Sequence, residues 1–310
     1  MAIKSINPAT GEVFESYDEA APDAVNKIIG EVNDAFLDWR KRPITDRAGP
    51  MRKAAAILRA EAHDHARLMA REMGKPVRDG IAEAQKCASG CDFYADNAER
   101  MLAREMIATE ARSSFVTFNP LGVVLAVMPW NFPFWQVFRF AAPGLMAGNA
   151  GVLKHASNVP GCALAIEDIF RRAGFPANLF RTLMIGNKRV DAVIEHPLVR
   201  AVTVTGSGAA GRAIAAKAGV GVRRVHEPAE DPFGFLLIIR RQGDVIVRLQ
   251  AGINTEGPLD SKERCQQGSR AGQSPQPFAA NVHLSQEHIT AGAGPPAGIT
   301  IRTRCYGAAF

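Results

Sequence analysis

Short apolar runs alternate with helix-forming stretches between residues 115 and 219, and this alternation is the strongest constraint on the fold. The runs read VVLAVM, GVLK, RTLMI and AVTVT, and the stretches that separate or follow them begin near Phe134, Pro160, Lys188 and Gly208. Apolar runs without internal alternation, each bounded by turn residues and followed by a helix, predict parallel strands buried on both faces. We therefore expect an α/β fold whose ligands bind at the carboxyl ends of the strands.

The first hundred residues show helical rather than strand spacing. Pro22 and Asp23 form a good helix start, and the apolar residues from Val25 to Phe36 recur at helical intervals. A second amphipathic helix is predicted from Ala54 through Leu68 to a stop at Gly74 and Pro76, and a third helix passes through residues 84–94. Cys87 and Cys91 lie one turn apart on the third helix, where we expect them to be buried as small apolar side chains.

Composition excludes several classes of protein. The chain has 310 residues, of which 47% are hydrophobic and 22% charged, so it can bury a sizeable core. Its net charge of +6 comes from interleaved basic and acidic residues, which argues against a nucleic-acid partner. Five cysteines without CxxC spacing argue against zinc and favour a reducing cytoplasm. No signal peptide is evident, and the apolar run 121–128 is too short for a membrane span, so we expect a cytoplasmic protein without a membrane partner.

The run TVTGSGAAGRAIAAKAG contains a GxGxxG pattern directly between a predicted strand and a predicted helix. The glycines are Gly206, Gly208 and Gly211, and Ser207 lies between the first two. Such a turn brings backbone N–H groups and a hydroxyl to the helix N-terminus, where a cofactor phosphate binds in Rossmann-like folds. A tight turn needs glycine for structural reasons alone, so both interpretations stay open.

A series of motifs in a fixed order resembles the aldehyde dehydrogenase superfamily. The series is INPATGEV, EMGKP, FNPLGVV, PWNFP, GN at residues 148–149 and TVTGS, and it covers roughly the first 220 residues. VLKHASNVP after MPWNFPFWQVFRFAAP looks most like the NADP-linked succinate-semialdehyde dehydrogenase branch. The resemblance implies an N-terminal helical part of the cofactor-binding region (1–114), a Rossmann-like dinucleotide-binding region (115–235) and a degenerate tail (236–310).

The resemblance also implies roles around the PWNFP motif. Asn131 corresponds to the family asparagine whose side-chain amide stabilises the oxyanion formed on the aldehyde, a role that suits one neutral donor in an apolar pocket. The alternative is an Asx turn before Pro133. Trp130, from the same motif, is assigned to the cofactor site. Arg139 corresponds to the guanidinium that holds the substrate carboxylate, and the alternative is a snorkelling surface arginine.

Cofactor contacts are implied at two further strand ends. Lys154 corresponds to the family lysine that contacts the adenosine ribose, and Ser157 stands three residues later. His155 is assigned to the cofactor site, with an ordinary surface imidazole as the alternative. NAD-preferring relatives often have a glutamate at the position of Ser157. A neutral hydroxyl there removes a charge that would repel a 2′-phosphate, so NADP is the favoured cofactor and NAD the second candidate. Gly206, Ser207 and Gly211 would contact the cofactor phosphates.

The catalytic residues that the family places later in its sequence are not found. A Leu-Glu-Leu-Gly-Gly strand with a general base is replaced by VHEPAED, in which Glu227 is a doubtful remnant of that base because Pro228 breaks strand pairing. A nucleophile in Gly-Gln-x-Cys is also missing: Cys265 lies in SKERCQQG and Cys305 in RTRCYGAAF, and neither context lowers a thiol pKa. The catalytic domain is therefore expected to be incomplete.

Residues 236–310 lose the strand and helix periodicity, and their Gly, Pro, Gln and Ser content predicts loop or disorder. A frameshift near Val225 would explain the abrupt change, and it would impair the family's homo-oligomer. Two functional hypotheses follow: oxidation of an aldehyde of the succinate-semialdehyde type, or a catalytically inactive nucleotide-binding remnant. A scaffold that uses no nucleotide is a third interpretation.

Overall fold

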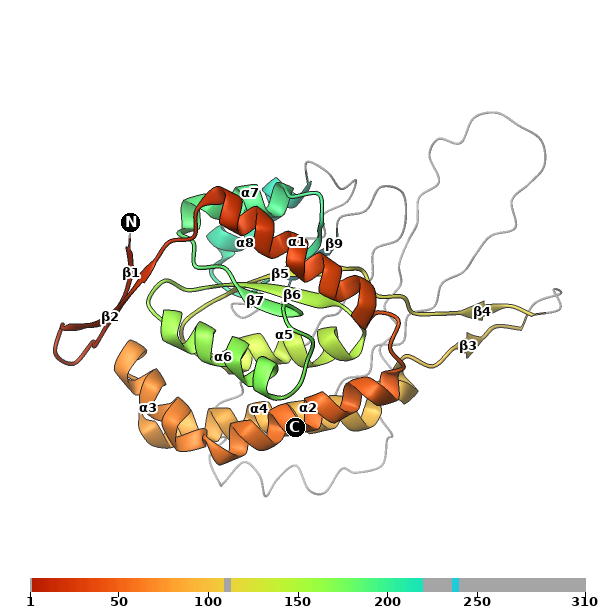
Figure 1. The fold of residues 1–310 in the computed structure, drawn as a ribbon, viewed down its shortest axis with the longest axis horizontal. Helices are drawn as coiled ribbons and strands as arrows, with labels where there is room; N and C mark the ends of the chain where they lie inside the picture. Colours follow the sequence, from red (N-terminus) through yellow and green to blue (C-terminus); the bar gives the residue numbers. More distant parts are fainter. Residues whose placement is uncertain (1, 109–112, 220–235, 240–310) are drawn as a thin grey trace, which may run out of the picture. The chain divides into compact units, whose positions relative to one another are not determined.

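A computed structural model describes residues 2–108, 113–219 and 236–239, and Figure 1 shows their arrangement. The predicted sites Glu227, Cys265 and Cys305, and most of the predicted tail, lie outside the described residues. The divisions proposed at residues 114 and 235 stay predictions.

A five-stranded sheet forms the centre of the described fold. It consists of β5 (Val123–Met128), β6 (Ala150–His155), β7 (Phe180–Thr182), β8 (Val199–Val204) and β9 (Leu236–Ile239) in the order β7-β6-β5-β8-β9. The first four strands are parallel, as predicted, whereas β9 pairs antiparallel with β8. All six residues of β6 are buried, which explains its uninterrupted apolar sequence.

Helices cover both faces of this sheet, as the apolar strands require. α5 (Trp135–Met146) and α6 (Pro160–Arg172) pack on one face, and α1 (Pro22–Trp39), α7 (Val190–Glu195) and α8 (Gly208–Gly219) lie on the other (Figure 1). A short 3₁₀ turn, η1 (Asn187–Arg189), precedes α7. Together with the family comparison below, this arrangement confirms the predicted α/β class.

A further layer of helices packs outside α5 and α6. It comprises α2 (Ile44–Ala60), α3 (Ala62–Met73) and α4 (Val77–Met101). The single helix predicted up to Gly74 is therefore wrong: the chain breaks at Glu61, whose ψ of 16° departs from helical geometry. Cys87 and Cys91 are fully buried on α4, which confirms the predicted packing role.

Two small antiparallel hairpins were not predicted. β1 (Ala2–Ile6) pairs with β2 (Val13–Asp18), and β3 (Glu105–Met106) pairs with β4 (Phe115–Val116). β1 buries only alternate residues, and β3 and β4 have two residues each. Neither hairpin therefore shows a long apolar run in the sequence.

Two buried carboxylates from the outer helices cap the N-termini of α5 and α6. Glu83 accepts hydrogen bonds from the backbone N–H groups of Phe134 and Trp135, both at 2.9 Å. Glu72 accepts from Gly161 at 2.8 Å and Cys162 at 2.9 Å. Each carboxylate satisfies donors that a helix start leaves unpaired and places a negative charge at the positive end of the helix dipole.

The opposite end of α5 is held by a cation and an indole. Arg47, buried on α2, donates from Nη1 to the carbonyl of Met146 at 2.9 Å, and Trp39 Nε1 donates to Leu145 O at 2.9 Å. A positive charge is favourable at a helix C-terminus. α5 is thus fixed at both ends by side chains from α1, α2 and α4, and this matters because it carries Arg139 and begins just after the turn of Asn131.

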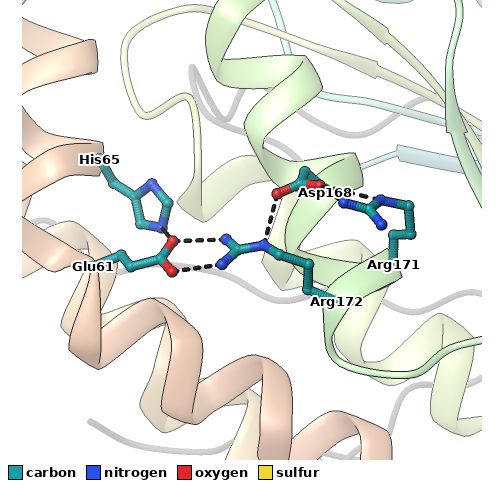
Figure 2. A network of polar contacts seen from close by, with 5 residues as sticks. All are labelled: Glu61, His65, Asp168, Arg171 and Arg172. Carbon is teal, nitrogen blue, oxygen red and sulfur yellow. Dashed lines mark hydrogen bonds and ion pairs between the residues drawn. The ribbon is translucent and has the colours of Figure 1, made fainter.

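A charge network links the start of α3 to the end of α6 (Figure 2). The guanidinium of Arg172 forms paired contacts of 2.5 and 2.6 Å with the carboxylate of Glu61, while its Nε lies 2.6 Å from Asp168. Hydrogen bonds from Arg172 lower the pKa of Glu61. Bidentate geometry is the arrangement in which a surface ion pair contributes most, so the network helps to hold α3 against α6.

Gly80 provides a test of the packing between α3 and α4. A Cβ added at this glycine would lie 2.8 Å from Ala66 Cβ and 2.9 Å from Ala66 Cα, and backbone atoms cannot move away cheaply. We expect Gly80→Ala to lower the free energy of unfolding by roughly 1–3 kcal/mol. Gly30→Ala on α1, where nothing lies within 4 Å, should instead raise it by up to about 1 kcal/mol. Urea denaturation of both variants decides; equal effects would contradict the packing argument.

Candidate functional site at the strand carboxyl ends

The carboxyl ends of β6, β5 and β8 bring the predicted site residues to one edge of the sheet. These strands are adjacent and parallel, with Met128 opposite His155 and Val127 opposite Val204 in the register. The chain order reverses between β5 and β8, because β6 and β7 lie on one side of β5 and β8 lies on the other. Open α/β sheets bind ligands at such a switch point.

Asn131 lies in the turn that joins β5 to α5 and is half-buried. Its side-chain Oδ1 accepts a hydrogen bond from the backbone N–H of Phe132 at 3.1 Å. Because this bond uses only the oxygen of the carboxamide, the Nδ2 group remains the donating end. Turn formation and donation to an oxyanion are therefore compatible, and the predicted oxyanion role stays a prediction.

Three buried side chains hold this turn: Lys75, Glu83 and His155. Lys75 Nζ donates to the carbonyl of Asn131 at 3.1 Å and forms a buried ion pair with Glu83. The same ammonium lies 3.8 Å from the ring centroid of Phe132. Glu83 in turn accepts from the first residues of α5, as described above, so the ion pair joins the turn to the helix that follows it.

His155 reaches the turn from β6. Its Nε2 lies 2.9 Å from the carbonyl oxygen of Pro133, and its Nδ1 accepts from the backbone N–H of Ala156 at 2.9 Å. Nδ1 also lies 3.3 Å from the carbonyl oxygen of Met128. A carbonyl only accepts, so the two shorter contacts, to Pro133 and Ala156, fit the neutral tautomer with hydrogen on Nε2. Complete burial lowers the pKa of His155 to about 4. Both ring nitrogens contact the backbone, which leaves neither for a hydrogen bond to a cofactor; the predicted cofactor role can involve only ring carbons.

Lys154 and Ser157 lie at the same end of β6. Lys154 is 3% exposed, and its Nζ donates to Asn187 Oδ1 at 2.5 Å, which directs the ammonium towards the segment after β7. Burial lowers the pKa of this lysine. Ser157 is exposed and borders a hollow whose lining contains no carboxylate. These positions fit the predicted ribose and 2′-phosphate contacts, which stay predictions.

The N-terminus of α8 differs from those of α5 and α6. Gly206, Ser207 and Gly208 are exposed, and the first turn of α8 contains no acidic residue. Ser207 Oγ accepts from the backbone N–H of Ala210 at 3.3 Å, as a helix-capping serine does. Gly211 is half-buried one turn into the helix. The segment can serve as a plain turn, and its exposed helix N-terminus also suits a phosphate.

Arg139 points from α5 to the carboxyl end of β8. Its Nη2 donates to Thr205 Oγ1 at 3.2 Å, and its Nε is buried. Burial lowers the pKa of Arg139, with a smaller opposing effect from Tyr94. Arg139 is half-buried, so the alternative of a snorkelling surface arginine stays open. Contact with a substrate carboxylate stays a prediction. Trp130, 49% exposed, adjoins the same turn.

The cysteines in the described part of the chain do not resemble nucleophiles. Cys87, Cys91 and Cys162 are fully buried, and burial raises the pKa of each thiol. A nucleophilic cysteine needs a lowered pKa and access to the substrate. The thiolate that the family chemistry requires is thus not among the described residues.

Sequence analysis missed Lys75, Glu83 and Glu72. Lys75 lies in the EMGKP motif, which was used only as a sign of resemblance and as a helix stop. Glu83 is 51 residues from Phe134, and Glu72 is 89 residues from Gly161. Helical spacing places both glutamates on inward faces, and an inward charge among apolar neighbours was the available signal.

The buried imidazole gives a pH dependence that can be tested. Because the folded-state pKa of His155 lies below its ordinary value of 6.5, the neutral ring stabilises the fold fully above pH 6.5, and this contribution is lost as the pH falls towards 4. The full change corresponds to roughly 3 kcal/mol of unfolding free energy. We expect His155→Gln to flatten the loss of stability between pH 7 and 5, and His63→Gln, at an exposed site, to leave it unchanged. Urea denaturation at several pH values gives the free energy of unfolding as a function of pH. If the pKa of His155 is not lowered, this free energy will fall equally with pH in His155→Gln and in the native chain.

Within residues 2–108, 113–219 and 236–239, no helix is long and apolar enough to cross a membrane. Nor does this part of the chain contain a group of three or more His, Cys, Asp or Glu residues that could hold a metal ion.

Comparison with known proteins gives a consistent family assignment. The family model described as aldehyde dehydrogenase family matches residues 1–227. A probable succinate-semialdehyde dehydrogenase [NADP(+)] of Synechocystis is 48% identical over 235 residues, which cover 75% of this chain and 52% of that protein. Succinate-semialdehyde dehydrogenase [NADP(+)] 1 of Mycobacterium bovis is 47% identical over 222 residues, or 71% of this chain and 49% of that protein. The chain therefore spans about half the length of these relatives.

Solved structures agree in fold. Succinic semialdehyde dehydrogenase from Streptococcus pyogenes, in complex with NADP+, aligns with a TM-score of 0.69 at 33% identity. The alignment covers 71% of this chain and 48% of that one. Since the family model matches residues 1–227, well over half of the chain, this chain belongs to the aldehyde dehydrogenase family.

Proposed function

We propose that this chain provides the NADP-binding and oxyanion-stabilising part of an aldehyde dehydrogenase that oxidises succinate semialdehyde to the carboxylic acid. The observation that carries the proposal is the meeting of three predicted elements at one edge of the sheet: the Asn131 turn, Lys154 and the N-terminus of α8. Residues 115–235 would form the cofactor-binding region, residues 1–114 its helical support and residues 236–310 a separate tail.

One feature favours NADP over NAD. Ser157 has a neutral hydroxyl where NAD-preferring relatives often have a glutamate, and the described residues that line the hollow beside it include no carboxylate. The Synechocystis and Mycobacterium bovis relatives are named for NADP(+). NADP supplies the hydride acceptor when it is bound. The residues of this chain would hold its ribose and phosphates and orient it at the switch point.

The substrate assignment rests on Arg139 and Asn131. The half-buried guanidinium of Arg139, which reaches from α5 to Thr205 after β8, can pair with the carboxylate of a short semialdehyde. The carboxamide of Asn131 can donate to the oxygen of the same molecule when a thiolate attacks its aldehyde carbon. A preorganised donor of this kind contributes about 3–4 kcal/mol to transition-state stabilisation. The proposed partners are thus a small aldehyde and NADP, in the cytoplasm, with the family homo-oligomer impaired.

The second candidate is a nucleotide-binding chain without turnover. The observation that favours it is the inert state of Cys87, Cys91 and Cys162, together with unsuitable sequence around Cys265 and Cys305. Glu227 is followed by proline, which does not suit the strand that carries the family's general base. Under this candidate, cofactor affinity is retained although the covalent step with the aldehyde is lost.

Cofactor preference tests the Lys154 and Ser157 assignment. We expect tighter binding of NADP than of NAD, and we expect Ser157→Glu to weaken NADP binding roughly tenfold, because a carboxylate would repel the 2′-phosphate across a partly solvated site. Ser89→Glu, on the exposed face of α4, adds the same charge away from the site and should change neither affinity. Calorimetric titration with both nucleotides measures the effect. Unchanged NADP affinity in Ser157→Glu would remove the argument.

Turnover separates the two candidates. We expect purified chain with NADP and succinate semialdehyde to give no steady formation of NADPH, because the covalent step needs a thiolate and the thiols among the described residues are buried. Absorbance at the NADPH band is the measurement. Turnover that disappears in Cys265→Ala would identify that cysteine as the nucleophile and reject the inactive alternative.

A further inference from the structure

We propose that Lys75 is a positioning residue that, paired with Glu83, orients and polarises the Asn131 carboxamide as a hydrogen-bond donor. The proposal rests on the function proposed above for Asn131 and adds two residues to it. Neither Lys75 nor Glu83 touches the place where an aldehyde oxygen would bind; both act through Asn131.

The argument begins with a continuous path of hydrogen bonds. Lys75 Nζ donates to the backbone carbonyl of Asn131 at 3.1 Å. The next N–H along that peptide group, on Phe132, donates to Asn131 Oδ1 at 3.1 Å. The nitrogen of the same carboxamide is the donor that would face an oxyanion. The path therefore runs from a cation through one peptide group and one carboxamide to the donor.

Amide resonance couples the two ends of each group on this path. A cation at the Asn131 carbonyl draws electron density from the peptide nitrogen and makes the Phe132 N–H a stronger donor. That N–H acts in the same way on the Asn131 side chain, whose Nδ2 hydrogens then become stronger donors. Such cooperativity strengthens each bond by about 10–30%. Without the Lys75 ammonium, the Asn131 side-chain amide would be a weaker hydrogen-bond donor.

Burial keeps the cation in this position. Lys75 is 8% exposed and Glu83 is 4% exposed. The ammonium contacts the Glu83 carboxylate, the Asn131 carbonyl and the face of the Phe132 ring, so its alternatives in the protein interior are few. Glu83 is itself fixed, because its other oxygen accepts the two N–H bonds of α5. The low dielectric constant around the pair also strengthens the electrostatic effect of the Lys75 ammonium on the Asn131 carbonyl.

Glu72 provides a matched structural control. It is a buried glutamate of the neighbouring helix α3, and it accepts two N–H bonds from the start of α6 just as Glu83 does from α5. It has no bond to Lys75 or to the Asn131 turn among the described contacts. A role limited to helix capping would thus be shared by both glutamates, whereas polarisation of Asn131 belongs to Glu83 and Lys75.

The experiment is NMR of the full chain labelled with ¹⁵N in its asparagines, with Asn131→Ser used to assign the Asn131 side-chain signal. The test variant is Lys75→Met/Glu83→Gln, because removal of one partner alone would leave an uncompensated buried charge. We expect the Asn131 side-chain ¹⁵N and ¹H resonances to move upfield in the test variant and to stay in place in Glu72→Gln. Equal shifts in the two variants, or no shift in either, would overturn the proposal.

A measurement on the native chain covers the case in which the double variant does not fold. With uniform ¹⁵N labelling, we expect the Phe132 amide to exchange with solvent slowly, although its side chain is 46% exposed, because the N–H is bonded to Asn131 Oδ1. Rapid exchange, as at an unbonded exposed amide, would break the path and reject the proposal. Neither NMR measurement uses NADP or an aldehyde. A negative NMR result therefore rejects the role of Lys75, whereas a negative titration or turnover result bears only on the proposed function.

Discussion

The buried carboxylate of Glu83 is the contact on which the candidate site depends. It satisfies the first N–H groups of α5 and pairs with the ammonium that holds the Asn131 carbonyl. An uncompensated charge in this interior would cost several kcal/mol, so the three partners are fixed together. The turn is thereby tied to α4 in the outer helical layer, in addition to its contact with His155 on β6.

The three helix N-termini near the strand ends serve different purposes. Those of α5 and α6 face buried glutamates of the outer helical layer, so their positive dipole ends are already neutralised by the protein. The N-terminus of α8 begins at exposed glycines and has no acidic residue in its first turn. An anionic ligand at this edge of the sheet would therefore find α8 the most favourable of the three, which agrees with the GxGxxG pattern there.

Sequence predicted the parts of the fold that local periodicity controls. Unalternated apolar runs located β5, β6 and β8, and helical spacing located α1 and the buried cysteines of α4. The break at Glu61 escaped prediction because neither glycine nor proline marks it; it is stabilised by Arg172, 111 residues away. The same holds for Glu72 and Glu83, whose partners are distant in sequence. Periodicity shows that a residue faces inward but not which donor it meets.

The last two residues of β6 show how strand geometry limits a prediction made by resemblance. Successive side chains on a strand point to opposite faces of the sheet, so Lys154 and His155 cannot act on the same group in the same way. Lys154 turns towards Asn187 in η1, while His155 turns towards Pro133 in the turn before α5. The alternation rule alone separates the two residues, and it could have been applied to the sequence. Lys154 therefore stays the residue predicted to contact a ligand at this strand end, whereas the ring nitrogens of His155 are engaged by the backbone.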